Sequence, residues 1–389
     1  MNILAIETSC DETALSIVRA EGALGATSFE VLADSLLSQV ELHKEYGGVY
    51  PSLAKREHAR NLAPLLQKTL IEAQMFTEAN APLSGDNISE LKELLEREPE
   101  LFILLIAFLG NTKKPDIDAV AVTHGPGLEP ALWVGINFAK ALARVWNIPL
   151  IPVNHMEGHV LSSLIKNNGI TAIEFPALAL LVSGGHTQLV TMSNWSQYEI
   201  VGETRDDAVG EAFDKVARML DLPYPGGPEI SKLAHMAREE NLSAPYILPR
   251  PMIESGDLDF SFSGLKTAVL YQIKDIKKEK EELTETDKKQ LAREFENACA
   301  EVLLEKTKRA IKKYSIKTFM LGGGVSANTH IRYTLQTHLP QEVTIYVPPI
   351  ALTGDNAIMI AAAGYSRFIS KKKLPNITAV KAEGNLALK

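Results

Sequence analysis

The sequence has few cysteines and no excess of positive charge. Its 389 residues include two cysteines, Cys10 and Cys299, far apart and in no C-x-x-C pattern. This usage excludes a disulfide framework and is typical of a reducing cytosol, so we expect no disulfide and a cytoplasmic protein. Lys and Arg number 40 against 48 Asp and Glu, a net charge of −8. An RNA substrate would therefore need a local basic patch or a helper protein, because no global positive field exists.

Long hydrophobic runs are also missing. The most apolar run, 101–109, has nine residues, whereas a membrane-spanning helix needs about 20. The first residues, MNILAIET, carry an acid at position 7 and no basic segment, which predicts a strand and not a signal peptide. With 46% hydrophobic and 23% charged residues, the chain is typical of a globular protein of two or three domains with no membrane partner.

Two patterns occur twice along the chain. Residues 3–18 and 178–192 each read as an apolar strand, a small polar turn and a second strand. Residues 118–165 and 317–368 share the order strand, glycine turn, helix, strand, loop, helix. The sequence therefore predicts an α/β fold of two duplicated halves with a central cleft, where small molecules usually bind.

The predicted lobes have definite boundaries. We expect an N-terminal lobe at 1–172, a C-terminal lobe at 173–356, and a C-terminal helix and tail at 357–389 that packs back on the N-terminal lobe. Residues 77–116 interrupt this plan and predict an inserted helical hairpin, with Pro99 ending or kinking its first helix. The apolar run at 101–109 must be buried, and we favour a partner interface over packing on its own lobe.

A second interruption, 273–290, is dense in charges of both signs. It predicts a solvated loop and helix face, and a basic RNA-facing patch is the alternative.

The segment HMEGH contains a candidate metal site. If residues 156 onward are helical, His155 and His159 stand one turn apart on one face and can share a metal ion. Asp355 occupies the equivalent loop-to-helix junction of the second half and is the candidate third ligand. The alternative is a pair of hydrogen-bonded histidines at a helix start. Glu157 lies two residues after His155, on another face of the helix, so a metalloprotease of the H-E-x-x-H type is disfavoured.

Two turns are candidate phosphate sites. Ser183, Gly184 and Gly185 lie between two strands, where glycines allow positive φ and let backbone N–H groups approach a phosphate. The N-terminal counterpart offers the hydroxyls of Thr8 and Ser9 and the acids Asp11 and Glu12. An acid there could hold a magnesium ion, and Asp11 and Glu12 are the candidate catalytic acids. The alternative for either turn is an ordinary hairpin turn.

Two further side chains are candidates for contacts with a nucleotide. Asn328 follows a glycine turn and could bond a ribose or base, and Asp214, on an expected helix, could accept from a hydroxyl. The turn is not G-x-G-x-x-G with a downstream acid, which disfavours a Rossmann site.

Ten short motifs follow one another along the chain: IETSCDET at 6–13, GPG at 125–127, HMEGH at 155–159, LLVSGGHTQL at 180–189, GEAFDK at 210–215, YPGGP at 224–228, PRP at 249–251, DFSFSGLKT at 259–267, GGVSAN at 323–328 and TGDNAIMIA at 353–361. Together they resemble the bacterial TsaD-type tRNA N6-adenosine threonylcarbamoyltransferase family over nearly the whole chain outside 77–116. Two departures are Asn154, where bacterial members often have histidine, and the insertion itself.

The resemblance implies an actin/hexokinase-type ATPase fold. It implies transfer of the threonylcarbamoyl group from threonylcarbamoyl-AMP to N6 of the adenosine 3′ of the anticodon, in tRNAs that read codons beginning with A. One divalent metal ion per subunit, iron favoured and zinc the alternative, would lie on His155, His159 and Asp355. ATP or ADP with magnesium is a further implied ligand. Substrate-contacting positions fall on Leu181, Val182, Ser183, Gly184, Gly185, Asp214, Gly227 and Asn328. Implied partners are tRNA, a paralogous subunit and an ATPase.

Two other functions remain as alternatives. A small-molecule carbamoyltransferase would share the metal motif, but carbamoyl phosphate chemistry normally comes with an extra domain for which 389 residues leave no room. A non-catalytic paralogue that scaffolds a complex would have little reason to keep His155, His159 and Asp355 together.

Overall fold

The structure is a computed structural model that describes residues 1–80, 82–243, 245–370 and 374–389. The expected insertion and tail each include positions outside these ranges, residue 81 and residues 371–373. The chain forms two compact units, 1–172 with 355–388 and 173–354 with Lys389. Among the described residues, no helix combines the length and apolarity that crossing a membrane requires.

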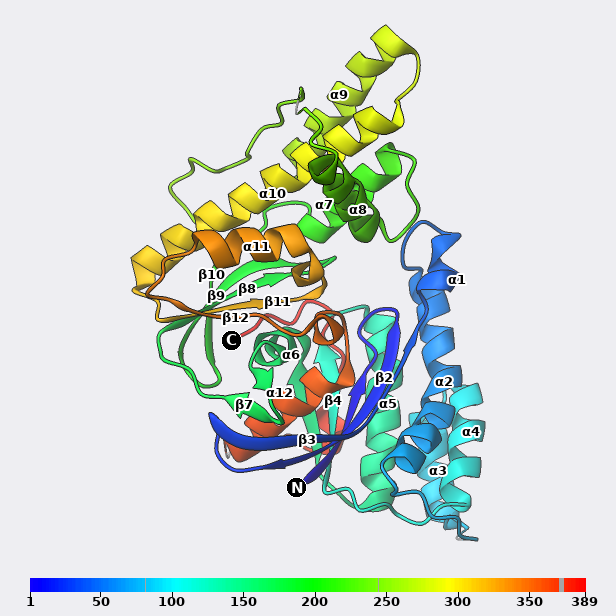
Figure 1. Ribbon diagram of the computed structural model, residues 1–389. Coiled ribbons are helices and arrows are strands. Elements are labelled where there is room, and N and C mark those ends of the chain that lie inside the picture. Colours follow the sequence, from blue (N-terminus) through cyan, green and yellow to red (C-terminus); the bar gives the residue numbers. More distant parts are fainter. Residues whose placement is uncertain (81, 244, 371–373) are drawn as a thin grey trace. The chain divides into compact units, whose positions relative to one another are not determined.

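A seven-stranded sheet, ordered β5-β4-β1-β2-β3-β7-β6, forms the centre of the first unit (Figure 1). Its strands are β1 (Asn2–Glu7), β2 (Glu12–Glu21), β3 (Ala26–Ser38), β4 (Ala119–Gly125), β5 (Leu150–Asn154), β6 (Ile165–Lys166) and β7 (Gly169–Thr171). The hairpin predicted at 3–18 is confirmed, since β1 and β2 pair antiparallel. β1, β4 and β5 run parallel, so their carboxyl ends lie at one edge of the sheet.

Helices cover both faces of this sheet, and β1 is accordingly buried along its whole length. The helices of this unit are α1 (Val40–Lys44), α2 (Pro51–Glu72), α3 (Gly85–Leu94), α4 (Pro99–Gly110), α5 (Glu129–Trp146), α6 (His155–Ser162), α12 (Ala357–Ile369) and the short η3 (Ile377–Ala379). Leu4 and Ile6 of β1 share a core cluster with α2 and α5. α12 covers the opposite face, where Gly364 lies against Ala121 of β4.

The insertion at 77–116 contains the predicted helical hairpin, α3 and α4. Pro99 does not end or kink the first helix, which stops at Leu94; it opens α4, where its missing N–H costs nothing. Leu101, Leu105 and Phe108 join the core cluster under α2, whereas Ile103 stays 67% exposed. Leu101, Leu105, Phe108 and Leu109 are thus buried by their own unit, because their one- and two-turn spacing gives α4 a face that fits α2. The partner interface that we favour for this segment stays a prediction.

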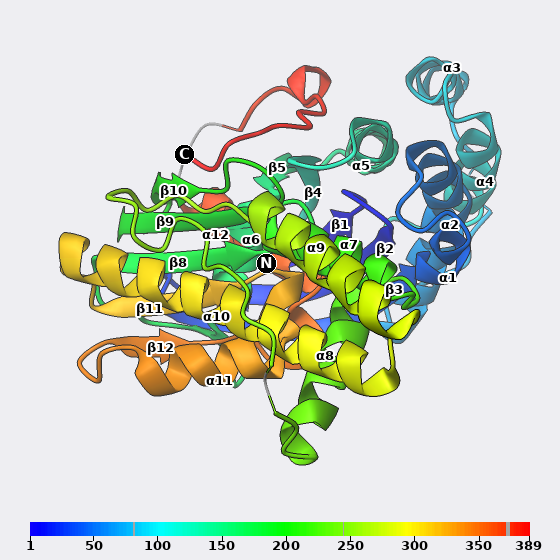
Figure 2. The ribbon, with the colours of Figure 1, turned by 90° about the horizontal axis from the view of Figure 1, so that it is seen from above.

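The second unit contains a five-stranded sheet ordered β10-β9-β8-β11-β12. Its strands are β8 (Ala177–Val182), β9 (Thr187–Asn194), β10 (Gln197–Glu203), β11 (Thr318–Gly322) and β12 (Thr344–Tyr346). Its helices are α7 (Val209–Met219), α8 (Gly226–Glu239), α9 (Ser263–Lys280), α10 (Glu285–Tyr314) and α11 (Thr329–His338), with short turns η1 (Gly324–Ala327) and η2 (Ile350–Leu352). α10 crosses the sheet between α8 and α11 (Figure 2). The hairpin predicted at 178–192 is confirmed by the antiparallel pair of β8 and β9.

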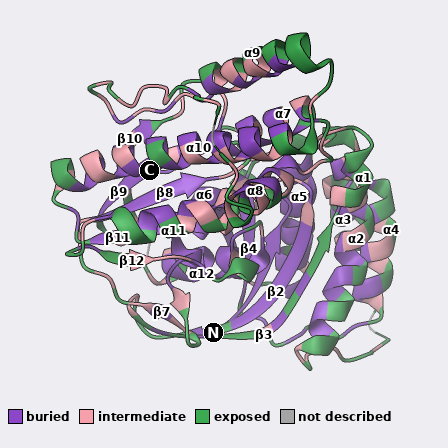
Figure 3. Cartoon of the chain, turned by 45° about the horizontal axis from the view of Figure 1, so that its top comes forward, coloured by how far each residue is buried: buried purple, intermediate pink, exposed green. Residues whose placement is uncertain are grey.

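The charged run at 273–290 belongs to the end of α9 and the start of α10, which begins at Glu285 after a capping box formed by Thr284 and Asp287. The end of α9 is exposed (Figure 3). Lys278 pairs with Asp275 and Lys280 pairs with Asp287. These pairs favour the solvated helix face over the basic patch.

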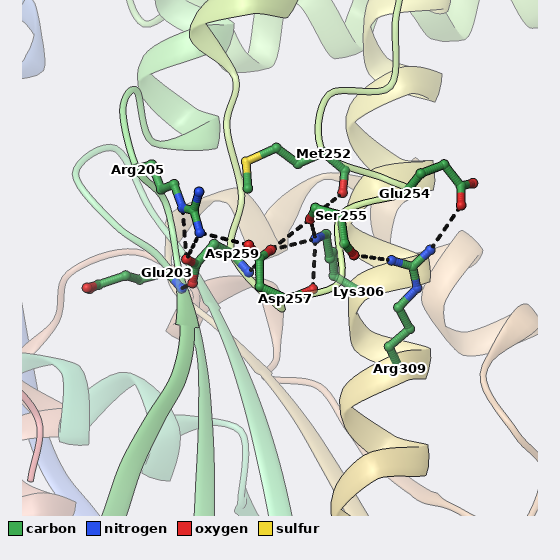
Figure 4. Close-up of polar contacts among 9 residues, drawn as sticks. All are labelled: Glu203, Arg205, Met252, Glu254, Ser255, Asp257, Asp259, Lys306 and Arg309. Carbon is green, nitrogen blue, oxygen red and sulfur yellow. Dashed lines mark hydrogen bonds and ion pairs between the residues drawn. The ribbon is translucent and has the colours of Figure 1, made fainter.

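An extended segment before α9 is held by ionic contacts, one of them to a buried lysine (Figure 4). Lys306 of α10, whose side chain is fully buried, donates through Nζ to Ser255 Oγ at 2.6 Å, to Asp257 O at 3.0 Å and to Asp257 Oδ1 at 3.2 Å. Arg205, just after β10, reaches Asp257 and Asp259 at 2.7 and 2.9 Å. The segment that leads into α9 is therefore fixed to both α10 and the sheet.

Candidate functional site

The two histidines lie at the carboxyl edge of the first sheet. His155 opens α6 directly after β5, and His159 follows one turn later. Asn154 caps the helix, accepting from Met156 N at 2.9 Å. Asparagine is among the best residues for this position, which gives the departure from the family's histidine a physical role.

Asp355 reaches the histidines because α12 packs closely on α6. A Cβ atom on Gly158 of α6 would lie 3.0 Å from Met359 Cγ of α12, so a larger residue would push the helices apart. Asp355 lies two residues before α12, which Asn356 caps by accepting from Met359 N at 2.9 Å. The two loop-to-helix junctions singled out in the sequence therefore meet within the first unit.

Donor atoms of His155, His159 and Asp355 all lie within 4.8 Å of one another. Nε2 of each histidine is 3.3 Å from Oδ1 of Asp355. His159 is fully buried, and neither of its ring nitrogens hydrogen-bonds any described residue. A buried imidazole without a hydrogen-bond partner, next to a second imidazole and a carboxylate, fits a metal ion, and two imidazoles with a carboxylate suit zinc or ferrous iron.

Burial and mutual charge set the protonation of this group. For Asp355, burial raises the pKa, but the neighbouring His155 and His159 outweigh it and hold the pKa well below its usual range. Burial lowers the pKa of His159, which therefore favours the neutral imidazole that a metal needs. For His155, burial is outweighed by the charges of Asp355 and Glu7, which raise its pKa.

Glu7 is a buried member of this site that sequence analysis missed. It ends β1, is fully buried, and accepts from Ser9 N, Thr123 Oγ1 and His155 Nδ1. Burial raises its pKa, but His155 outweighs this and the net pKa is lowered. The sequence signal for Glu7 was an acid at the end of the apolar run ILAI. A carboxylate buried with such a run needs hydrogen-bond donors or a cation beside it, which indicates a polar site.

The turn between β1 and β2 carries the candidate phosphate and catalytic residues. Thr8 is fully buried and its hydroxyl donates to Ala131 O at 3.1 Å, so it faces α5. Ser9 Oγ lies 3.3 Å from His155 Nδ1. Asp11 has a buried Oδ2 with no partner among the described residues. Burial, followed by the charges of Asp355 and Asp11, raises the pKa of Glu12 to about 9, so Glu12 keeps its proton at neutral pH.

In the second unit, a cavity of about 330 Å³ lies beyond the carboxyl ends of β8 and β11. Its lining includes four predicted residues, Gly184, Asp214, Gly227 and Asn328. Leu181 and Val182 are fully buried strand residues, and they are absent from the lining, as are Ser183 and Gly185. The cavity is concave and mostly apolar with a few polar groups, the usual form of a small-molecule site.

The expected positive φ at Gly184 and Gly185 is wrong. Neither adopts it, and a Cβ atom on either would meet nothing within 4 Å. The turn is closed instead by Ser183, whose N–H donates to His186 O at 2.8 Å. Gly185→Val would therefore act by filling space and not through backbone strain. The positive φ is found instead at Gly323, where φ is +88°. An added Cβ there would lie only 2.4 Å from Val182 O, so this position requires glycine.

Gly323→Ala is expected to destabilise the protein by about 1–3 kcal/mol, because alanine at this φ is strained and its Cβ meets the carbonyl of Val182. Urea unfolding measures this change. The matched control is Gly324→Ala, where an added Cβ meets nothing within 4 Å and φ is not positive. Equal stability of the two variants would contradict the prediction.

The side chain of Asn328, which lines the cavity, makes three hydrogen bonds within the protein. Its Oδ1 accepts from Ile331 N at 2.9 Å, and its Nδ2 donates to Ser231 Oγ and Glu296 Oε1, each at 2.7 Å. Asn328 thus caps α11 and holds the cavity wall. Ser231, on α8, also lines the cavity and was missed by sequence analysis.

Asp214 lies on α7 as expected and lines the cavity. Its Oδ1 accepts from Gly226 N at 2.7 Å, so it links α7 to the start of α8. Burial raises its pKa even though backbone donors from Gly226 and Gly227 oppose the shift. A carboxylate held this way can still accept from a ligand hydroxyl through its other oxygen.

Known proteins resemble this chain closely. The model of the tRNA N6-adenosine threonylcarbamoyltransferase (TsaD) family matches residues 30–79 and 104–362, omitting most of the inserted hairpin. Proteins given that name from Polynucleobacter necessarius and Bacillus subtilis are 43% and 42% identical to it, over 95% of this chain and 93% and 91% of theirs.

One solved structure with a similar fold is full-length HypF in its phosphate- and nucleotide-bound form, with a TM-score of 0.52 and 12% identity over 96% of this chain and 47% of HypF. At this identity the likeness shows the fold alone, which is the expected actin/hexokinase-type ATPase fold. The family match and the curated relatives each cover most of the sequence, and the chain belongs to the tRNA N6-adenosine threonylcarbamoyltransferase family.

Proposed function

We propose that this protein transfers the threonylcarbamoyl group from threonylcarbamoyl-AMP to N6 of the adenosine 3′ of the anticodon, in tRNAs that read codons beginning with A. The observation that carries the proposal is the 42–43% identity to enzymes of that name along 95% of the chain. The site geometry adds support, because the chain keeps a set of metal donors and a cavity suited to a nucleotide.

The first unit supplies the metal site of this proposal. His155, His159 and Asp355 would hold one divalent ion, iron by preference and zinc as the alternative. When bound, such an ion supplies Lewis-acid stabilisation of charge on a carbamoyl or phosphate oxygen. Asp11 and Glu12, in the turn after β1, are the candidate catalytic acids, and Asp11 offers an unpartnered oxygen as a candidate acceptor.

The second unit supplies the nucleotide site. Asp214 accepts from a ribose hydroxyl, and the bare backbone at Gly184 and Gly227 lets the adenylate approach closely. Ser183 and Gly185, which flank the cavity loop, and Leu181 and Val182, which form the strand behind it, act by shaping it. Asn328 holds the wall through its bonds to α8 and α10.

Partners and location follow from the same proposal. The tRNA is bound together with a paralogous subunit and an ATPase, in the cytoplasm. A net charge of −8 supports the need for helper proteins, because the chain lacks a field that would hold RNA by itself. Bound ATP or ADP with magnesium belongs to the same proposal.

Reconstitution with unmodified tRNA, threonylcarbamoyl-AMP and the candidate partner proteins tests the proposal, with the modified adenosine measured by mass spectrometry. We expect the modification only when this protein is present. Fully modified tRNA in cells that lack the gene would overturn it. Rapid turnover of carbamoyl phosphate without tRNA would favour the small-molecule carbamoyltransferase instead.

The protonated state of Glu12 predicts how stability depends on pH in the metal-free protein. The folded pKa of about 9 lies above the ordinary 4.5, so the folded state keeps a proton that the unfolded state releases. This stabilisation is complete below pH 4.5 and is lost as the pH rises towards 9, by up to about 1.4 kcal/mol per pH unit. Glu12→Gln mimics the protonated form and is expected to flatten this slope.

Urea unfolding of chelator-treated protein at pH 5.5 and pH 8 measures the effect. Glu41→Gln, at a carboxylate whose side chain is 80% exposed, is the control and should keep the slope of the wild type. An unchanged slope in Glu12→Gln would contradict the raised pKa.

A further inference from the structure

Glu7 is a charged residue in a place where charge is costly. It follows the buried apolar residues of β1 and is itself fully buried. Burying an isolated carboxylate costs several kcal/mol, so such a group persists only when hydrogen bonds compensate it. The contacts of Glu7 therefore indicate what the residue is for.

Three donors surround the carboxylate. Oε1 accepts from Ser9 N at 2.6 Å, and Oε2 accepts from Thr123 Oγ1 at 2.5 Å. Oε2 also lies 3.2 Å from Nδ1 of His155. These donors come from the carboxyl ends of β1, β4 and β5, which the parallel pairing brings to one edge of the sheet.

This arrangement selects one tautomer of His155. The carboxylate can only accept, so in the neutral imidazole that a metal ion binds the proton lies on Nδ1, and Nε2 carries the lone pair. Nε2 is the atom that lies 3.3 Å from Asp355 Oδ1. Glu7 thus holds His155 in the form and orientation in which it can bind a metal.

His159 has no equivalent support. Its Nδ1 is buried and has no hydrogen-bond partner among the described residues. The two histidines therefore differ: the ring of His155 is fixed by a carboxylate, and that of His159 is fixed by packing.

We propose that Glu7 is a positioning residue that fixes the tautomer and ring orientation of His155 and so strengthens metal binding through Nε2. The inference rests on the proposed metal site. A carboxylate behind a metal-bound histidine also raises the basicity of the ligand, and removing such a partner typically weakens metal binding by about 10–100-fold.

Glu7→Gln tests the proposal with Co²⁺ as the probe. Glutamine keeps the shape of the glutamate side chain, but one of its two polar ends is an NH₂ donor. This NH₂ must face either Ser9 N–H or the groups of Thr123 and His155, so at least one hydrogen bond is replaced by two donors facing each other. We expect Co²⁺ to bind about 10–100-fold more weakly, with a changed visible absorption spectrum. The matched control is Glu98→Gln, a buried carboxylate of the same unit that pairs with Lys55 and not with a histidine; it should bind Co²⁺ like the wild type.

The outcomes separate this inference from the metal site itself. If His159→Ala binds Co²⁺ as the wild type does, the metal site is wrong. If His159→Ala loses Co²⁺ while Glu7→Gln keeps the affinity and spectrum of the wild type, the metal site stands and the role of Glu7 is overturned. Should Glu7→Gln fail to fold in chelator, Thr123→Val decides, since it removes one donor to Glu7 at nearly constant volume. A weaker and spectrally altered Co²⁺ complex in Thr123→Val supports the proposal, and an unchanged one overturns it.

Discussion

Replacing His159 with alanine is expected to weaken binding of Zn²⁺ or Co²⁺ by at least about 100-fold. Loss of a residue that only supports a ligand costs up to about 100-fold, and His159 is itself a proposed ligand. Only His155 and Asp355 would remain, and two protein ligands do not make a stable site. Transfer to tRNA should be lost with the metal. The fold should survive, because neither ring nitrogen of His159 hydrogen-bonds a described residue, so alanine breaks no hydrogen bond that holds the helix.

Metal titration and metal content after dialysis measure this effect, and circular dichroism checks the fold. His43→Ala is the matched control, because His43 is equally buried in the same unit but lies outside the donor cluster. If His159→Ala kept the metal content of the wild type, the assignment of the three donors would fail.

Replacing Lys306 with methionine is expected to destabilise the protein by about 1–3 kcal/mol, the cost of leaving a buried hydrogen-bonding group without its partner. Methionine keeps most of the buried stem but removes the ammonium, which donates to Ser255 Oγ and to two oxygens of Asp257 (Figure 4). The cost stays below that of a fully buried ion pair, because the side chain of Asp257 is 37% exposed and its Oδ1 keeps Ser255 Oγ and Asp259 N as donors.

Urea unfolding gives the change in free energy, and hydrogen exchange shows whether residues 249–262 lose protection. The control on the same helix is Lys308→Met, where the lysine is 36% exposed and pairs with Glu305 one turn earlier. That change should cost under about 0.5 kcal/mol. Equal effects at the two positions would show that the contacts of Lys306 contribute nothing beyond a surface pair.

The group of three metal donors was predictable because each of its residues has a signal in the sequence. His155 and His159 are four residues apart, which places them on one face of any helix that contains both. Asp355 needed a non-local argument, and the duplicated order of elements supplied it. The hairpins at 3–18 and 178–192 were predictable for a similar reason, since apolar runs on both sides of a polar turn have few other solutions.

Other features depend on packing that the sequence does not show. The GG pair at 184–185 is the usual signal for positive φ, yet the residue that adopts it is Gly323. Gly323 follows β11 and lies against Val182 of β8, and these two strands are neighbours only in the folded sheet. Asn328 also bonds Ile331, Ser231 and Glu296, and the last two lie 97 and 32 residues away along the chain. A contact across such distances leaves no pattern in a single sequence.

The discontinuity of the first unit has a consequence for how the protein is made. Its sheet and both histidines are translated before residue 173, but Asp355 and α12 follow only after the whole of 173–354. A nascent chain can therefore form most of the sheet while the face that α12 covers is still bare, and it cannot assemble the three donors until translation is nearly complete. A truncated product that ends before residue 355 lacks the third donor, so it cannot assemble the proposed metal site.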